Sequence, residues 1–147
     1  MISIRSRWLI GSIVLVLGLV FIYAGVIKTF DVVAFYKQIR LYHLVSDEGA
    51  WLVAHFLPWF EIIGGLGLFW KESRVAAAFL TTLLLLTYAA AIIFVWKLGL
   101  HIDCGCFGGT GMAPHYPWNY VWVLIRDAVM ASGAVYVLVF STLRVKT

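Results

Sequence analysis

The sequence predicts an all-α membrane protein: a bundle of four transmembrane helices with a short interfacial helix in its first outer loop. Hydrophobic residues make up 63% of the 147 residues and charged residues only 12%, whereas a soluble domain carries roughly 25% charged residues. One small core could not bury so much apolar surface. Four apolar runs of about 20 residues are each long enough to cross a hydrocarbon core of roughly 30 Å.

The predicted spans lie within a single membrane domain, residues 1–147, whose expected surroundings are membrane lipid. They cover residues 8–27, 51–70, 75–96 and 120–140. The first run is too long for the apolar region of a typical signal peptide, and no small-x-small cleavage site precedes Lys28. We therefore expect it to be retained as a span.

Two longer connections leave the spans on the same side. In the first, Val32, Phe35 and Ile39 recur at helical spacing, which predicts an amphipathic helix over about residues 31–44 lying in the membrane interface. The second, residues 97–119, holds five glycines, two prolines and both cysteines of the chain. Its composition predicts an ordered loop rather than a helix.

Lysine and arginine are more frequent on one side of the predicted bundle than on the other, six residues against four. The richer side holds Arg5, Arg7, Lys71, Arg74, Arg144 and Lys146. This bias predicts cytoplasmic termini and a periplasmic cysteine loop in a bacterial inner membrane. The net charge of +4 fits the same anchoring, and no basic patch interleaved with aromatic residues indicates nucleic-acid binding.

The two cysteines, Cys104 and Cys106, are separated only by Gly105. A disulfide across one residue is strained and therefore easily reduced, and it would constrain the unfolded chain very little. An outward-facing loop lies in a compartment that permits disulfides. The pair is thus predicted to exchange disulfides. Asp103 disfavours a thiolate at Cys104 and so weakly favours Cys106 as the readier thiolate, but the sequence does not assign which cysteine attacks.

Two other functions stay open for the same loop. Cys104 and Cys106 with His101 could bind a soft metal ion such as Cu(I) or Zn²⁺. The loop could also recruit a partner without any chemistry, in which case the chain is a membrane scaffold rather than a thiol–disulfide oxidoreductase.

Ionisable residues inside a membrane are costly and often functional. Glu61 lies roughly 15 Å into the second span, while Arg126 and Asp127 lie roughly 9–10 Å into the fourth. We expect Glu61 and Arg126 to form an ion pair inside the bundle, and Lys28 to reach the outer interface by snorkelling. The pair either sets the helix register or serves as a proton relay or a polar anchor for a quinone head group.

These features resemble the MauE/DoxX-like membrane proteins over nearly the whole chain. The most specific element is Cys104-Gly-Cys-Phe-Gly108, and looser matches are Phe21-Ile-Tyr-Ala-Gly25 with Lys28, Pro58 with Glu61 and Gly64, and Arg126-Asp127. The resemblance implies a four-helix inner-membrane protein that acts with a periplasmic thioredoxin-like partner in the maturation of methylamine dehydrogenase, a disulfide-rich enzyme.

The architecture is also similar to DsbB and the vitamin K epoxide reductases, which join periplasmic thiols to a membrane quinone. This similarity implies a quinone as cofactor and makes Glu61, Arg126, Asp127, Lys28 and Asp103 candidates for a quinone site or its polar support. The chain departs from those proteins because it has one cysteine pair and lacks the second pair that shuttles electrons.

Overall fold

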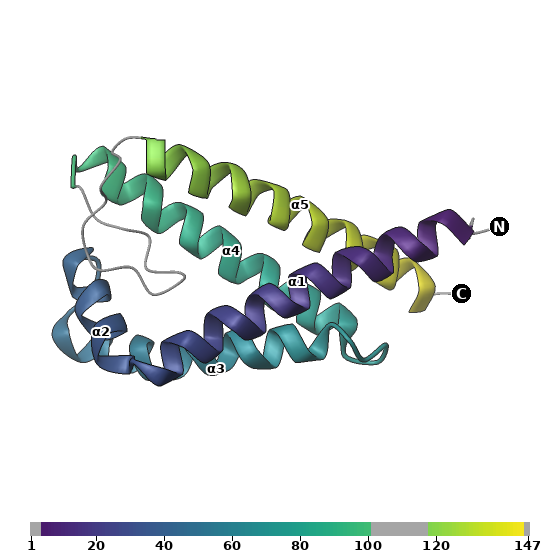
Figure 1. Cartoon of the computed structure of the whole chain (residues 1–147), viewed down its shortest axis with the longest axis horizontal. Coiled ribbons are helices and arrows are strands. Elements are labelled where there is room, and N and C mark those ends of the chain that lie inside the picture. Colours follow the sequence, from purple (N-terminus) through teal and green to yellow (C-terminus); the bar gives the residue numbers. More distant parts are fainter. Residues whose placement is uncertain (1–3, 101–117, 146–147) are drawn as a thin grey trace.

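The computed structural model describes residues 4–100 and 118–145, with the side chains of residues 8–100 and 118–143. Every regular element in these ranges is a helix (Figure 1). The helices are α1 (Ile4–Phe30), α2 (Val32–Leu41), α3 (Asp47–Gly67), α4 (Arg74–Lys97) and α5 (Trp118–Val145). All but α2 are long and apolar enough to cross a membrane, so the predicted all-α, four-span class is confirmed.

The helix bounds differ from the predicted apolar spans: most helix ends lie beyond them, but α3 ends at Gly67 instead of residue 70. α1 continues to Phe30 instead of ending at residue 27, and α3 begins at Asp47 instead of residue 51. At the start of α3, the Ser46 hydroxyl accepts a hydrogen bond from the amide of Gly49, and Asp47 and Glu48 follow in the first turn. A cap and acidic residues of this kind stabilise the start of a helix. They explain why α3 begins with a polar turn that the apolar run does not include.

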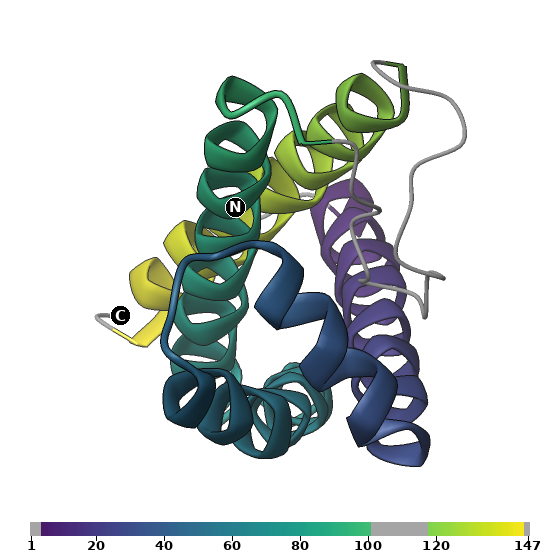
Figure 2. The same cartoon turned by 90° about the vertical axis from the view of Figure 1, so that its left-hand side faces the viewer.

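A short helix does form in the first long connection. α2 starts after Asp31, whose carboxylate accepts a hydrogen bond from the amide of Ala34, and it ends at Leu41, earlier than the predicted boundary near residue 44. Its Gln38 is buried, so one face is turned toward the bundle. Figure 2 shows α2 crossing one end of the bundle, beside α1 and α3. Its place in a membrane interface stays a prediction.

The four long helices form two closely packed pairs, α1 with α3 and α4 with α5. Glycines allow the close approach of α1 and α3: a Cβ on Gly65 would lie 2.8 Å from the carbonyl oxygen of Gly18, and one on Gly25 would lie 2.7 Å from that of Pro58. Close backbone contact of this kind is a main source of helix association in lipid. The two pairs diverge toward the end of the bundle where α2 lies (Figure 1).

The two ends of the described chain lie at the same end of the bundle, and the turn from α3 to α4 is also there (Figure 1). α4 ends and α5 begins at the opposite end, near α2. A core of buried apolar side chains from α1, α4, α5 and the residue after α3 joins these helices. It includes Val14, Leu17, Phe21, Leu68, Leu84, Leu85 and Val137.

Candidate functional site

The cysteine loop contains four of the predicted site residues, which are Cys104, Cys106, Asp103 and His101. All four lie outside the described residues. The loop joins the C-terminal end of α4 to the N-terminal end of α5, and both of these helix ends lie at the α2 end of the bundle (Figure 1).

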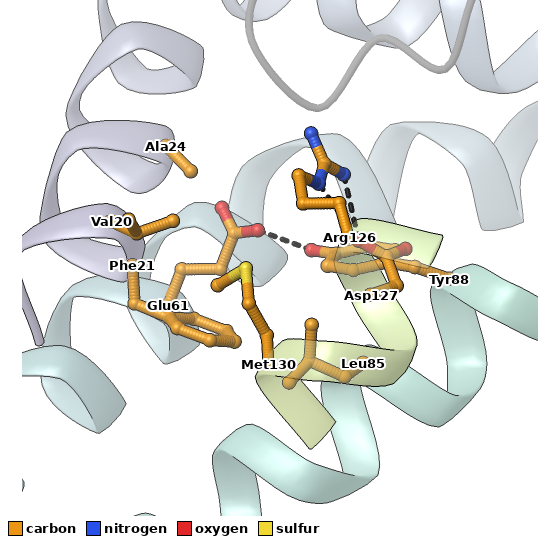
Figure 3. A pocket seen from close by; sticks show the side chains of 9 residues that line it. All are labelled: Val20, Phe21, Ala24, Glu61, Leu85, Tyr88, Arg126, Asp127 and Met130. Atoms are coloured by element: carbon orange, nitrogen blue, oxygen red, sulfur yellow. Dashed lines mark hydrogen bonds and ion pairs between the residues drawn. The ribbon is translucent and has the colours of Figure 1, made fainter. Parts of the chain in front are cut away.

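The predicted ionisable residues inside the spans gather around one small cavity among α1, α3, α4 and α5 (Figure 3). Its volume is about 30 Å³, and Glu61, Arg126 and Asp127 contribute its charged lining. Glu61 is 1% exposed and Asp127 is 2% exposed. The structure therefore brings together charges from two helices that are far apart in the sequence.

Glu61 is held by groups from two other helices. The ammonium of Lys28 on α1 lies 2.5 Å from its Oε1, and the hydroxyl of Tyr88 on α4 donates a hydrogen bond to the same oxygen. The prediction that Lys28 snorkels to the interface is wrong, since its side chain is 2% exposed. The reason is that α1 continues past Lys28 to Phe30, so the Lys28 side chain lies where α1 packs against α3.

The surroundings of Lys28 suit a buried cation. Its ammonium lies 5.1 Å from the ring centroids of both Phe35 and Tyr88, within the range in which an aromatic face attracts a cation. Lys28 therefore connects α1 to α3 through Glu61, to α2 through Phe35 and to α4 through Tyr88.

Arg126 pairs with its own neighbour rather than with Glu61. Its Nε and Nη2 donate hydrogen bonds to Oδ1 of Asp127 at 3.0 and 2.8 Å. The predicted ion pair between Glu61 and Arg126 is therefore wrong in its partners, because Lys28 takes the Glu61 carboxylate and Asp127 takes the Arg126 guanidinium. Glu61 of the first pair and both residues of the second pair still border the same cavity.

Tyr88 was not predicted as a site residue. It lies at i+7 and i+3 from the buried residues Thr81 and Leu85, on the face of α4 that is turned toward the core. The available signal was a single tyrosine in the apolar run of residues 75–96, since a buried tyrosine hydroxyl usually needs a hydrogen-bond partner.

A second, larger cavity lies between α2, α3 and α4. Its volume is about 210 Å³, and its lining is almost entirely apolar. Side chains that line it include Phe35, Ile39, Tyr42, Val53, Leu57 and Ile92. Its wall also contains the polar residues Gln38, Thr87 and Tyr88. Tyr88 borders the smaller cavity as well.

The larger cavity has the character expected of a site for an apolar ring compound. Ligand pockets are mostly apolar with a few placed polar groups, and here Gln38 and Tyr88 supply such groups. The residues present thus fit a membrane quinone. Among the described residues, no three His, Cys, Asp or Glu side chains lie close enough together to hold a metal ion.

Apolar helices long enough to cross a membrane, arranged around buried ion pairs, define a polytopic helical membrane protein. The family model described as "Methylamine utilisation protein MauE" matches residues 6–140, and the chain belongs to this family, as its motifs predicted. The methylamine utilization protein MauE of Paracoccus denitrificans is 34% identical over 119 residues, which are 80% of this chain and 62% of that relative. The chain thus spans less than two thirds of that relative's length, and no solved structure matches it.

Proposed function

We propose that the chain is a membrane thiol–disulfide exchange protein whose exchanging pair is Cys104 and Cys106. The observation that carries this function is the spacing of the two cysteines around a single glycine in the connection between α4 and α5. A disulfide in such a small ring is strained and easily reduced. Membership of a family named for methylamine utilisation supports a role in the maturation of a disulfide-containing partner.

The exchange balances without any further reactant. A thiolate of a periplasmic thioredoxin-like partner attacks one sulfur of the Cys104–Cys106 disulfide, which forms a mixed disulfide and releases the other cysteine as a thiolate. The partner's second thiolate then attacks the mixed disulfide. The partner leaves oxidised, and Cys104 and Cys106 remain as a dithiol that has gained two electrons and, after protonation, two protons.

Charge and topology support the proposed location. The two ends of the described chain lie at one end of the bundle, and the greater number of Lys and Arg residues on that side supports a cytoplasmic position for both termini. The cysteine loop then faces the periplasm of a bacterial inner membrane, where a soluble partner reaches it.

The larger cavity supports a link to a membrane quinone. When bound, a quinone would supply an acceptor for two electrons. Gln38 and Tyr88 are the polar groups that would meet its ring, while Ile39, Val53 and Ile92 would contact its apolar part. Glu61, Lys28, Arg126 and Asp127 form the buried polar support behind Tyr88.

Thiol trapping in native membranes tests the exchange function. The membranes are equilibrated in graded redox buffers, and free thiols are modified with a membrane-impermeant maleimide. A reversible two-electron transition well above about −300 mV is the expected result for a labile pair. Thiols that stay reduced in every buffer and react only after a chelator is added would overturn exchange in favour of soft-metal binding.

Single and double serine variants separate exchange from scaffolding. Cys104→Ser and Cys106→Ser should each abolish completed exchange, and in each variant the thiolate that remains should form a mixed disulfide by attacking the disulfide of an added oxidised partner. A double Cys→Ser variant that still supports maturation of the partner would contradict exchange and favour a scaffold.

A further inference from the structure

Two buried carboxylates face the smaller cavity with one oxygen each left over. Oε1 of Glu61 accepts from Lys28 and Tyr88, and Oδ1 of Asp127 accepts from Arg126. Oε2 of Glu61 and Oδ2 of Asp127 are buried and accept no hydrogen bond within the part of the chain that the structure describes. Buried polar atoms almost always have a partner, so two exceptions at one cavity require an explanation.

The cavity has the size and lining of a water site. Its volume of about 30 Å³ exceeds the roughly 10–15 Å³ that one water molecule needs by this measure. Water also needs two to four polar partners, and Glu61, Tyr88, Arg126 and Asp127 line the space (Figure 3).

Among the described residues, the charges of the two ion pairs at the cavity balance. Lys28 on α1 and Arg126 on α5 are the cations, and Glu61 on α3 and Asp127 on α5 are the anions. Tyr88 on α4 is a further titratable group that faces Glu61, and the ring of Phe35 on α2 lies beside Lys28. A further metal cation would leave this cluster with excess positive charge, so the free oxygens favour a neutral ligand.

We infer that the smaller cavity is a water-binding site whose bound water bridges Oε2 of Glu61 to Oδ2 of Asp127 and lets a proton pass between them. The water completes a hydrogen-bonded chain from Lys28 on α1 to Arg126 on α5, across the two helix pairs. This site is separate from the cysteine chemistry, so it stands or falls independently of exchange at Cys104 and Cys106.

Hydroxyl-radical footprinting of the full chain in lipid nanodiscs tests for the water. Phe21 borders the cavity although it is only 3% exposed, whereas Tyr120 is 1% exposed and lies away from it. Phe21 should be oxidised faster than Tyr120, and the added oxygen should come from H₂¹⁸O. Labelling of Phe21 no faster than that of Tyr120 would overturn the water site.

A filled cavity gives the matched comparison. Ala24 lines the cavity, so Ala24→Val should displace water and lower the labelling of Phe21. Ala90→Val makes the same change on an exposed position of α4 and should leave that labelling unchanged. Equal labelling in folded Ala24→Val and wild type would contradict a water at this place.

Infrared difference spectroscopy of the wild type tests proton sharing even if Ala24→Val fails to fold. Acidification should produce a carboxyl C=O band that shifts in D₂O and is lost in both Glu61→Gln and Asp127→Asn, because both groups belong to one bridged pair. Loss of the band in only one variant, or absence of the band in wild type, would overturn the sharing of a proton.

Discussion

Two ion pairs meet at one small cavity, which Glu61 of the first and both residues of the second line, and the pairs differ in the helices that they join. Lys28 and Glu61 connect α1 to α3, and their side chains are 2% and 1% exposed. Arg126 and Asp127 are neighbours on α5, and the Arg126 side chain is 33% exposed. The first pair can therefore determine how two helices pack, whereas the second mainly neutralises a carboxylate within one helix.

Glu61→Gln should have the largest effect on stability. It leaves the ammonium of Lys28 buried without a counter-charge, and breaking a buried pair in this way costs about 3–5 kcal/mol. Asp127→Asn should cost less, since the partly exposed Arg126 can turn toward a polar environment. Both effects are measured as the loss of unfolding free energy in mixed micelles. Equal losses in Glu61→Gln and Asp127→Asn would show that the two pairs play the same role.

A double variant checks that the loss comes from the unpaired charge. Lys28→Met combined with Glu61→Leu removes both charges and keeps similar volumes, a replacement that is often neutral or stabilising for buried pairs. Most of the stability lost in Glu61→Gln should return. A double variant less stable than the single one would point to a packing role for the polar groups instead.

The sequence was sufficient to predict the class of fold and to select the charged residues of the cluster. Long apolar runs identify spans because length and hydrophobicity are local properties. Glu61, Arg126 and Asp127 were recognisable because charges are rare inside spans. Their convergence on one cavity is consistent with that reasoning.

The pairing of these charges was not predictable in the same way. Depth along a span does not determine which way a side chain faces, and each residue turns the helix by about 100°. Lys28 was placed at an interface because the apolar run ends at Ile27, yet α1 continues to Phe30. The contact of Gly25 with Pro58 then brings this part of α1 close to Glu61, which only the packed structure reveals.

Tyr88→Phe tests the third group on Glu61. It removes the hydroxyl that donates to Oε1 but keeps the ring beside Lys28, and hydrogen bonds to charged groups contribute about 1.5–3 kcal/mol. Unfolding free energy should fall by an amount in this range. Tyr136→Phe, on a half-exposed position of α5, is the control, and an equal effect at both positions would argue against a special role for Tyr88.

Gly25→Ala tests the helix contact that brings Lys28 to Glu61. The added Cβ would lie 2.7 Å from the carbonyl oxygen of Pro58, so α1 must move away from α3. Overpacking of this kind costs about 1–3 kcal/mol, and thermal unfolding should occur at a lower temperature. Gly11→Ala meets nothing within 4 Å and should be neutral or slightly stabilising because alanine favours helix; similar losses in both variants would exclude the contact as the cause.

The smallest effect is expected at an exposed pair of similar geometry. Nε of Arg40, near the end of α2, lies 2.7 Å from Oδ1 of Asp47, at the start of α3, but these side chains are 51% and 67% exposed. Exposed pairs contribute about 0–1 kcal/mol and are weakened by salt. Arg40→Gln should thus lower the unfolding free energy only slightly, and less at high salt, with Lys37→Gln on an exposed position of the same helix as control.

Distances in the two interhelical pairs differ little, at 2.7 Å for Arg40–Asp47 and 2.5 Å for Lys28–Glu61. If Arg40→Gln lowers the free energy of unfolding as much as Glu61→Gln does, then proximity of opposite charges determines the stability of the bundle. If it costs far less, as we expect, burial is the deciding factor, because water and salt replace a lost partner at the surface but not between α1 and α3.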